Sequence, residues 1–207
     1  MNLGRRLARL ATDAVVRSPV LWRVFRGPIR REFEKLAPSW DAMRSAGHQE
    51  SLGAALAAIP DMPRRVLDVG TGTGVAARAI AARWPDAEVV GVDVAEGMIV
   101  EARRLLPDDL AGRVRFEHAD ASALPFEDAS FDLVTLANMI PFFDEIDRVL
   151  APGGRVAFVW SVGADTPIYV PPDRLRAKLA PRGFGEFQEL EANPGTAFLA
   201  RKPLARG

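Results

Sequence analysis

Residues 66–78 read VLDVGTGTGVAAR, with an aspartate at position 68 and glycines at positions 70, 72 and 74. A short run of β-branched residues that ends in alternating glycines predicts a strand followed by a sharp turn, because glycine adopts backbone conformations that other residues avoid. The alanine-rich segment that follows predicts a helix. Free amides at the start of such a helix suit an anion or the polar edge of a ligand. The stretch therefore predicts a ligand-binding turn between a strand and a helix.

Strand-like and helix-like segments continue to alternate after this turn. Helical patterns at residues 76–84 and 97–106 separate the first three strand-like runs, and another follows at residues 173–179. Alternation at this spacing predicts crossover units, and therefore a parallel sheet with helices on both faces. The last two runs flank Asn193-Pro194-Gly195 and predict an antiparallel hairpin. We expect an α/β fold with a Rossmann-like, doubly wound, mostly parallel seven-stranded sheet, its strands at residues 66–69, 88–93, 114–118, 131–137, 155–162, 184–191 and 196–201.

The first 63 residues have a different, helical character. Apolar residues recur there at helical spacing, and Ser18-Pro19 is typical of a helix start. Gly27-Pro28 should end that second helix, because proline cannot donate the backbone hydrogen bond that continues it. Two more helices are predicted around residues 29–36 and 52–59. We expect residues 1–63 to be a helical N-terminal extension and residues 64–207 to be the ligand-binding domain; the first helix carries the stripe Leu3, Leu7, Leu10 and Ala14.

Composition excludes several kinds of site. The 207 residues include no cysteine, which excludes disulfides, thiolate nucleophiles and cysteine-based zinc sites. Lysine plus arginine equals aspartate plus glutamate at 27 each, so no global charge attracts nucleic acid. No apolar run approaches the roughly 20 residues of a membrane span, and residues 1–25 lack a secretory signal pattern. We expect a cytoplasmic protein without a metal site, and the sequence leaves its oligomeric state open.

Three aspartates follow three successive predicted strands. Asp68, Asp93 and Asp120 lie at or just after the carboxyl ends of these strands, where doubly wound sheets bind their ligands. The glycines can be aligned with a dinucleotide fingerprint that ends at Ala77, which would indicate a nicotinamide-dependent oxidoreductase. A buried carboxylate at position 68 would repel a pyrophosphate but suits the ammonium of an amino-acid-like ligand, provided that donors satisfy it. Both interpretations use Asp93 as an acceptor for ribose hydroxyls.

Five motifs in this order resemble the class I S-adenosylmethionine-dependent methyltransferases, in particular the small-molecule branch known as the type 11 methyltransferase domain. They are VLDVGTGTG, VVGVDVAEGMI, FEHADASALPF, FDLVTLANM and IDRVLAPGGRVAFVW. The resemblance implies that the glycine loop holds the methionine part of S-adenosylmethionine and that the acid after the second strand binds ribose. It also implies that Val94 and Met98 contact the adenine faces, that Asp120 and Ala121 contact the adenine edge, and that Asn138 faces the transferable methyl group. The cofactor residues expected in all are Asp68, Gly70, Thr71, Gly72, Gly74, Asp93, Val94, Met98, Asp120, Ala121 and Asn138.

The sequence departs from the family pattern in three places. Ala95 stands where the family usually has a serine, so the helix that follows loses its expected cap. The segment after the fourth strand lacks the histidine that many relatives carry there, which leaves the acceptor pocket without that base. Residues 138–142 resemble the Asn-Pro-Pro-aromatic box of nucleic-acid amine methyltransferases but have the wrong spacing. A nucleic-acid substrate is therefore disfavoured, and a small-molecule acceptor is expected.

Candidate catalytic residues are few, because methyl transfer from a sulfonium depends mainly on alignment and exclusion of water. His48 and Asn138 are the candidates, and His118 is interpreted as a packed or partly exposed strand residue. Trp40-Asp41 occupies the place of an aromatic-Asp pair in relatives, where it would either cover the cofactor or pack the helical extension onto the domain. Tyr169, the only tyrosine, is given no role.

Residues 1–31 contain eight arginines and the single acid Asp13. Two explanations stay open at this point. Either the leucines pack on the domain and the arginines face water, or an amphipathic helix lies on an anionic membrane with Trp22 and Phe25 at the headgroups, each basic residue contributing about 1 kcal/mol. A dimer contact or an acidic substrate is a further alternative. For the whole chain we expect S-adenosylmethionine-dependent methylation of a small or lipophilic molecule, with a nicotinamide-dependent oxidoreductase or a non-catalytic binding protein as alternatives.

Overall fold

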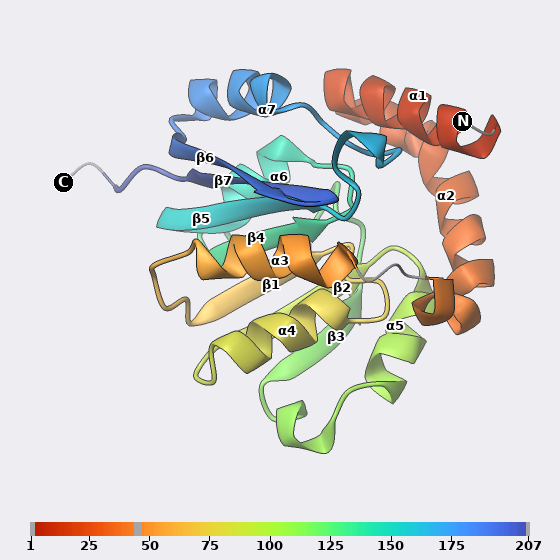
Figure 1. Cartoon of the computed structure of the whole chain (residues 1–207), viewed down its shortest axis with the longest axis horizontal. Coiled ribbons are helices and arrows are strands. Elements are labelled where there is room, and N and C mark those ends of the chain that lie inside the picture. The colour runs from red at the N-terminus through yellow and green to blue at the C-terminus, as the bar shows by residue number, and fades with distance from the viewer. Residues whose placement is uncertain (1–2, 44–46, 206–207) are drawn as a thin grey trace.

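The computed structural model describes the backbone of residues 3–43 and 47–205 and the side chains of residues 5–42 and 50–205. Figure 1 shows a central sheet with helices on both faces and two N-terminal helices at one end of the strands. The α-helices are α1 (Leu3–Arg17), α2 (Trp22–Leu36), α3 (Gly47–Ala57), α4 (Val75–Arg83), α5 (Glu96–Arg104), α6 (Phe143–Val149) and α7 (Pro172–Leu179). The 3-10 turns are η1 (Pro19–Leu21), η2 (Ala37–Ser39), η3 (Asp41–Met43), η4 (Asp108–Leu110), η5 (Gly163–Asp165) and η6 (Ala180–Arg182).

The sheet has seven strands in the order β3-β2-β1-β4-β5-β7-β6. The strands are β1 (Arg65–Val69), β2 (Glu88–Asp93), β3 (Val114–His118), β4 (Phe131–Ala137), β5 (Leu150–Trp160), β6 (Gly185–Ala192) and β7 (Gly195–Arg201). The first five pair in parallel, and β7 pairs antiparallel with both β5 and β6. The order reverses between β1 and β4, and ligands of doubly wound sheets bind at such a switch point. The predicted fold class is confirmed, including the C-terminal hairpin.

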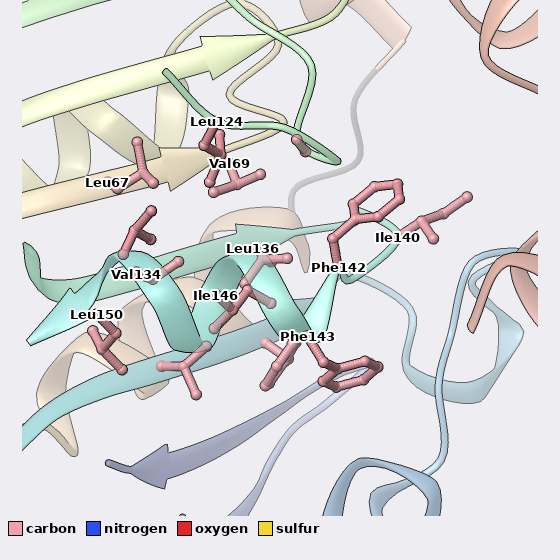
Figure 2. Close-up of a cluster of buried hydrophobic side chains, with 14 of the residues drawn as sticks. Leu67, Val69, Leu124, Val134, Leu136, Ile140, Phe142, Phe143, Ile146 and Leu150 are labelled. Carbon is pink, nitrogen blue, oxygen red and sulfur yellow. The ribbon is translucent and has the colours of Figure 1, made fainter. Parts of the chain in front are cut away.

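The central strands are buried on both faces, as parallel strands with helices on both sides must be. Val66 packs with α3, α4 and α5 on one face of β1, whereas Leu67 and Val69 pack with α6 and α7 on the other. Figure 2 shows the second face, where side chains of β1, β4 and α6 converge. This alternation fixes the register of β1, because a shift by one residue would turn Asp68 toward the second cluster.

The two N-terminal helices close the carboxyl end of the sheet. Val15 and Val16 of α1 and Trp22 of α2 are buried in the cluster of α6 and α7. The α2 helix then runs along the strand ends and reaches α5 (Figure 1). Arg9 of α1 donates to the carbonyls of Ala164 and Thr166, which ties α1 to the segment after β5. These contacts fix which face of α1 points away from the protein.

The prediction that a helix ends at Gly27-Pro28 is wrong. The α2 helix is continuous from Trp22 to Leu36 with Pro28 inside it. Apolar residues on its inward face keep helical spacing on both sides of Pro28. Phe25, Ile29 and Phe33 all pack against buried clusters. Val24, whose carbonyl loses its helical partner, is exposed, so water can satisfy that carbonyl. The free energy gained by packing this face therefore exceeds the cost of the backbone hydrogen bond that Pro28 cannot donate.

Two other differences concern short elements. The α6 helix was not predicted, because its seven residues give only two turns for a periodic pattern to appear in. Pro19 begins η1 rather than an α-helix, and Ser18 makes no side-chain cap. The helix predicted around residues 52–59 is α3. Among the described residues, no helix combines the length and apolarity required to cross a membrane.

Candidate active site

The loop between β1 and α4 is shaped by left-handed backbone conformations. Gly70, Gly72 and Gly74 have φ values of 70°, 54° and 81°, which favour glycine. The amides of Gly70 and Thr71 donate to the Val92 carbonyl at 2.8 and 2.9 Å, so the loop folds back onto the end of β2. A Cβ at Gly74 would lie 2.5 Å from the Phe116 ring, whereas a Cβ at Gly70 would lie 2.7 Å from Met139 Sδ. The third glycine is therefore required for packing against Phe116, and the first one for the close approach of Met139.

Asp68 is fully buried beneath this loop. Its Oδ2 accepts from Thr71 Oγ1 at 2.6 Å, and its Oδ1 accepts from Thr135 Oγ1 at 2.8 Å. Burial raises the pKa of Asp68 to about 6, although these two hydroxyls oppose the shift. The donors required for a buried carboxylate are thus supplied by the protein itself. Asp68 holds the loop from behind, and its contact with a ligand ammonium stays a prediction.

Asp93 ends β2 and connects the glycine loop to α5. Its Oδ2 accepts from the Gly72 amide at 3.0 Å, and its Oδ1 accepts from the Ala95 amide at 2.9 Å. Burial raises the pKa of Asp93, and hydrogen bonds from backbone amides reduce this increase. A carboxylate offers about four acceptor positions, so these backbone bonds leave Asp93 with acceptor capacity. The carboxylate can therefore accept ribose hydroxyls without leaving its position.

Asp120 follows β3 and is already bonded to the N-terminal helices. Its Oδ1 accepts from Trp22 Nε1 at 2.8 Å and from the amide and hydroxyl of Ser122, while its Oδ2 accepts from Arg26 Nη1 at 2.8 Å. Burial alone would raise the pKa of Asp120, but the bonds from Arg26, Ser122 and Trp22 hold it below its usual value. The carboxylate expected at the adenine edge is thus ionised and shares its oxygens with α2.

The start of α5 is capped from a distance. Ala95 makes no side-chain cap, as expected, and Glu34 of α2 instead accepts from the amides of Glu96 and Gly97 at 2.8 and 2.7 Å. A Cβ at Gly97 would lie 2.7 Å from Glu34 Oε2, so glycine gives this carboxylate room. A carboxylate at a helix N-terminus is also stabilised by the helix dipole. The extension thereby replaces the missing serine cap beside the ribose acid.

Asn138 follows β4 in a left-handed conformation, with a φ of 53°. Its Oδ1 accepts from the Ser161 amide at 3.1 Å, which joins the ends of β4 and β5. Asparagine tolerates this conformation better than most residues. The turn places Met139 over Gly70, and Phe142 beyond it packs edge-on against Trp22, with ring centroids 5.4 Å apart. Apolar side chains therefore line the side of the loop where an acceptor would approach.

The aromatic-Asp pair lies over the glycine loop. Asp41 Oδ1 accepts from Thr73 Oγ1 at 2.5 Å, and the indole nitrogen of Trp40 would lie 3.5 Å from a Cβ at Gly72. Trp40 also packs edge-on against Phe33, and both border the small cluster of Ala37, Ala95 and Met98. This position suits both expected roles, since the pair covers the loop and packs the extension onto the domain.

The histidines and the tyrosine are placed as follows. The side chain of His48, in the first turn of α3, lies outside the described side chains. His118 Nε2 is 2.9 Å from the Val94 carbonyl oxygen and its Nδ1 is 3.3 Å from Glu96 Oε2, so the interpretation as a partly exposed strand residue is confirmed. Tyr169 packs edge-on against Trp160, and burial raises its pKa, which makes it a poor base.

The expected cofactor residues that follow β1, β2 and β3 lie at one edge of the sheet. Val94 and Met98 follow β2, and the buried Ala121 follows β3. It also adds residues that the sequence did not reveal. Trp22, Arg26 and Glu34 reach this edge from α2 over separations of 62 residues or more. The only sequence signal for them was the apolar stripe of α2, which indicates an inward face but not its partner.

Comparison with known proteins agrees with this geometry. Residues 66–154 match the family model described as a methyltransferase domain. The resemblance to the class I S-adenosylmethionine-dependent methyltransferases is confirmed by this match and by the relatives below. These matches support the methyltransferase interpretation over the nicotinamide-dependent oxidoreductase, which rested on the glycine pattern ending at Ala77. Within this family the methyl donor is S-adenosylmethionine.

The names of the relatives give different methyl acceptors. A demethylmenaquinone methyltransferase from Thermus thermophilus is 41% identical over 139 residues, which cover 60% of this chain and 61% of that protein. A malonyl-[acyl-carrier protein] O-methyltransferase from Geobacter sulfurreducens is 33% identical over 170 residues, covering 81% and 58%. The chain thus spans about three fifths of the length of these relatives. A chain from the Haloferax volcanii complex of the Trm112 methyltransferase activator with a methyltransferase shares the fold, with a TM-score of 0.70, 20% identity and coverage of 83% and 98%.

Proposed function

We propose that this chain transfers a methyl group from S-adenosylmethionine to a small lipophilic molecule. The observation that carries the proposal is the line of groups along the carboxyl edge of β1, β2 and β3, with the glycine loop, Asp93 and Asp120 in sequence order. When bound, S-adenosylmethionine supplies a methyl group on a positively charged sulfur, which is already activated for displacement. The proposal assigns the remaining work, which is binding, alignment and exclusion of water, to the protein.

The residues at this edge fit such a cofactor. Met139 occupies the space beside Gly70 that a Cβ would take, and its flexible side chain can move aside for the methionine part of the cofactor. Asp93 retains acceptor capacity for ribose hydroxyls, and the half-buried Val94 offers an apolar contact for adenine. Met98 is 1% exposed and packs with Ala37 and Ala95, so it would support the adenine site from within the core. Because Asp68 and Thr71 bond to each other, we assign them to holding the loop, and their direct contact with the cofactor stays a prediction. These assignments, like the boundary between the extension and the domain at residue 63, are proposals.

The acceptor side supports a lipophilic substrate. Phe142, which follows β4, packs on Trp22, and Tyr169, which follows β5, packs on Trp160. The relatives that act on demethylmenaquinone and on malonyl-[acyl-carrier protein] are consistent with an apolar acceptor or one with an acyl chain. An amide does not take up a proton at neutral pH, so we assign Asn138 to orientation of the acceptor. His48 stays a candidate base.

We also propose that α1, η1 and the start of α2 contact an anionic membrane, from which a lipophilic acceptor would be taken. Leu7 and Leu10 of α1, Val20 and Leu21 of η1, and Val24 of α2 are exposed, and these five apolar side chains are here called the outer face. The alternative that the leucines pack on the domain is wrong for Leu7 and Leu10, because α1 turns Val15 and Val16 inward instead.

The charges beside the outer face favour an anionic surface. The exposed Arg6 and Arg17 share a helical face with Leu10, and Arg23 lies beside Val24. Asp13 is the only acid in residues 1–31 and is paired with Arg174. The expectation that Trp22 lies at the headgroups is wrong, since Trp22 is buried and bonded to Asp120, and Phe25 is half-buried. The exposed leucine and valine side chains, rather than the aromatic ones, would therefore insert into the membrane.

Methyl transfer to extracts tests the enzymatic proposal. Purified protein is incubated with S-adenosylmethionine labelled in its methyl group and with either the organic or the aqueous fraction of a bacterial extract. We expect label in the organic fraction, and none with the Asp93→Ala variant. Label confined to the aqueous fraction would contradict a lipophilic acceptor. Binding of the labelled cofactor without transfer to either fraction would favour the non-catalytic alternative.

Flotation with vesicles tests the membrane contact. We expect the protein to float with vesicles that contain phosphatidylglycerol and to remain below with pure phosphatidylcholine. The double variant Leu7→Ser, Leu10→Ser should lose flotation, whereas Val100→Ser, which changes an exposed apolar residue of α5, should retain it. Equal flotation of the double variant and the wild type would contradict the role of the outer face.

A further inference from the structure

The two oxygens of Asp120 have very different partners. Oδ1 accepts three hydrogen bonds, from Trp22 Nε1, the Ser122 amide and the Ser122 hydroxyl, at 2.8 to 2.9 Å. Oδ2 accepts one, from Arg26 Nη1 at 2.8 Å. Three donors surround Oδ1, so Oδ2 is the oxygen that a ligand donor would reach.

The donors also differ in how firmly they are held. Trp22 is buried at 3% exposure and packs against Phe142, so its indole cannot leave without opening the core. The Arg26 side chain is 55% exposed and lies at the rim. An exposed ion pair contributes little because water competes for both charges. The carboxylate is therefore fixed through one oxygen and only loosely held through the other.

We propose that Arg26 is a displaceable partner of Asp120, which yields its place on Oδ2 to the exocyclic amine of adenine while Trp22 positions the carboxylate through Oδ1. This inference rests on the proposed role of Asp120 at the adenine edge. Arg26 is then a residue that limits cofactor affinity, and Trp22 is a positioning residue that supports it.

The exchange does not require α2 to move. Trp22 remains in the core, and Glu34 remains bonded to the amides at the start of α5. Arg26 lies between these two attachments on the same helix, so rotation of its side chain suffices. The neutral adenine amine would replace a cation, which leaves the ionised carboxylate without its counter-ion. That loss is the energetic reason for a weakened affinity.

Calorimetric titration of the full chain with S-adenosylhomocysteine tests the exchange. Arg26→Ala should bind about two- to fivefold more tightly than the wild type, the range expected for removal of a competing exposed ion pair. Arg31→Ala, which changes an exposed arginine of the same helix, should bind like the wild type. Trp22→Phe keeps a ring in the core but removes the donor, and it should bind more weakly. Opposite signs for Arg26 and Trp22 are the signature of the proposal.

Ionic strength provides a second readout that a purely structural role would not move. Raising the salt concentration screens the partly exposed Arg26–Asp120 pair, so binding by the wild type should tighten while binding by Arg26→Ala stays constant. Equal or weaker binding by Arg26→Ala, together with normal binding by the wild type, would overturn the exchange but leave the proposed function intact. Absence of binding by the wild type would overturn both.

Discussion

The carboxyl edge of the sheet and the two N-terminal helices meet at one site but are built in opposite ways. At the edge the backbone sets the geometry, through three glycines with positive φ and a carboxylate that ties the loop to the next strand. In α1 and α2, side chains make the contacts, over separations of 94 residues or more for Trp22, Arg26 and Arg9. Damage to the edge should therefore impair folding, whereas damage to the helices should mainly change attachment and affinity.

Gly74→Ala should have the largest effect of the changes considered. The new Cβ would require a left-handed alanine and would lie 2.5 Å from the ring of Phe116, a buried strand residue. Left-handed strain and overpacking together should lower the unfolding free energy by about 3 kcal/mol. Gly53→Ala, where a Cβ would contact nothing and the residue is helical, should instead raise it by up to about 1 kcal/mol. Urea denaturation measures both, and a Gly74→Ala variant as stable as the wild type would contradict the packing of this loop.

Asp68→Asn should reveal the buried carboxylate through pH. The folded pKa is raised from 3.8 to about 6, so between these values the folded protein binds more protons than the unfolded chain, and its stability falls as the pH rises. Relative to Asp68→Asn, the wild type should gain about 2 kcal/mol of unfolding free energy when the pH is lowered from 7.5 to 4.5. Denaturation curves at several pH values give this difference. A constant difference would mean that Asp68 titrates normally.

Glu34→Ala should have a smaller effect, because it removes a contact of the helices rather than the loop itself. The amides of Glu96 and Gly97 lose their acceptor, and loss of a helix cap costs about 1 kcal/mol. Glu32→Ala, at an exposed position of the same helix, is the matched control and should stay within about 0.5 kcal/mol of the wild type. Equal unfolding free energies for the two variants would mean that the contact between α2 and α5 does not stabilise the protein.

Leu10→Ser should have the smallest effect on stability, since this side chain is 64% exposed and the change buries nothing. The unfolding free energy should stay within about 0.5 kcal/mol of the wild type. Val15→Ala, on the opposite face of α1, should cost about 1 to 3 kcal/mol, because Val15 is buried in the core. Thermal denaturation distinguishes the two, and equal losses would mean that α1 is attached by its outer face.

The same contrast explains what the sequence could predict. The strands at residues 88–93, 114–118 and 131–137 agree with the structure residue for residue, because burial on both faces leaves compact runs of β-branched and aromatic residues. The three acids at the strand ends were predictable from strand boundaries alone. The methyltransferase family was predictable because its motifs are local and occur in order.

The contacts of the extension were not predictable in the same way. The length of α2 depends on packing across Pro28, which a local rule counts as a helix end. The pairing of Asp120 with Trp22 and Arg26, and the cap that Glu34 gives to α5, exist only once the strand ends and α2 are placed together. Ala95 showed that a cap was missing but not which residue supplies it.

Titration of S-adenosylhomocysteine into the wild type, Asp93→Asn and Asp86→Asn tests the central claim most directly. Asp93 lies at the carboxyl end of β2, where the cofactor is proposed to bind, and Asp86 is exposed before the opposite end of the same strand. We predict one binding event per chain for the wild type, binding weakened at least about tenfold for Asp93→Asn, and unchanged binding for Asp86→Asn. No detectable binding by the wild type, or equal binding by Asp93→Asn, would contradict a cofactor site at this edge of the sheet.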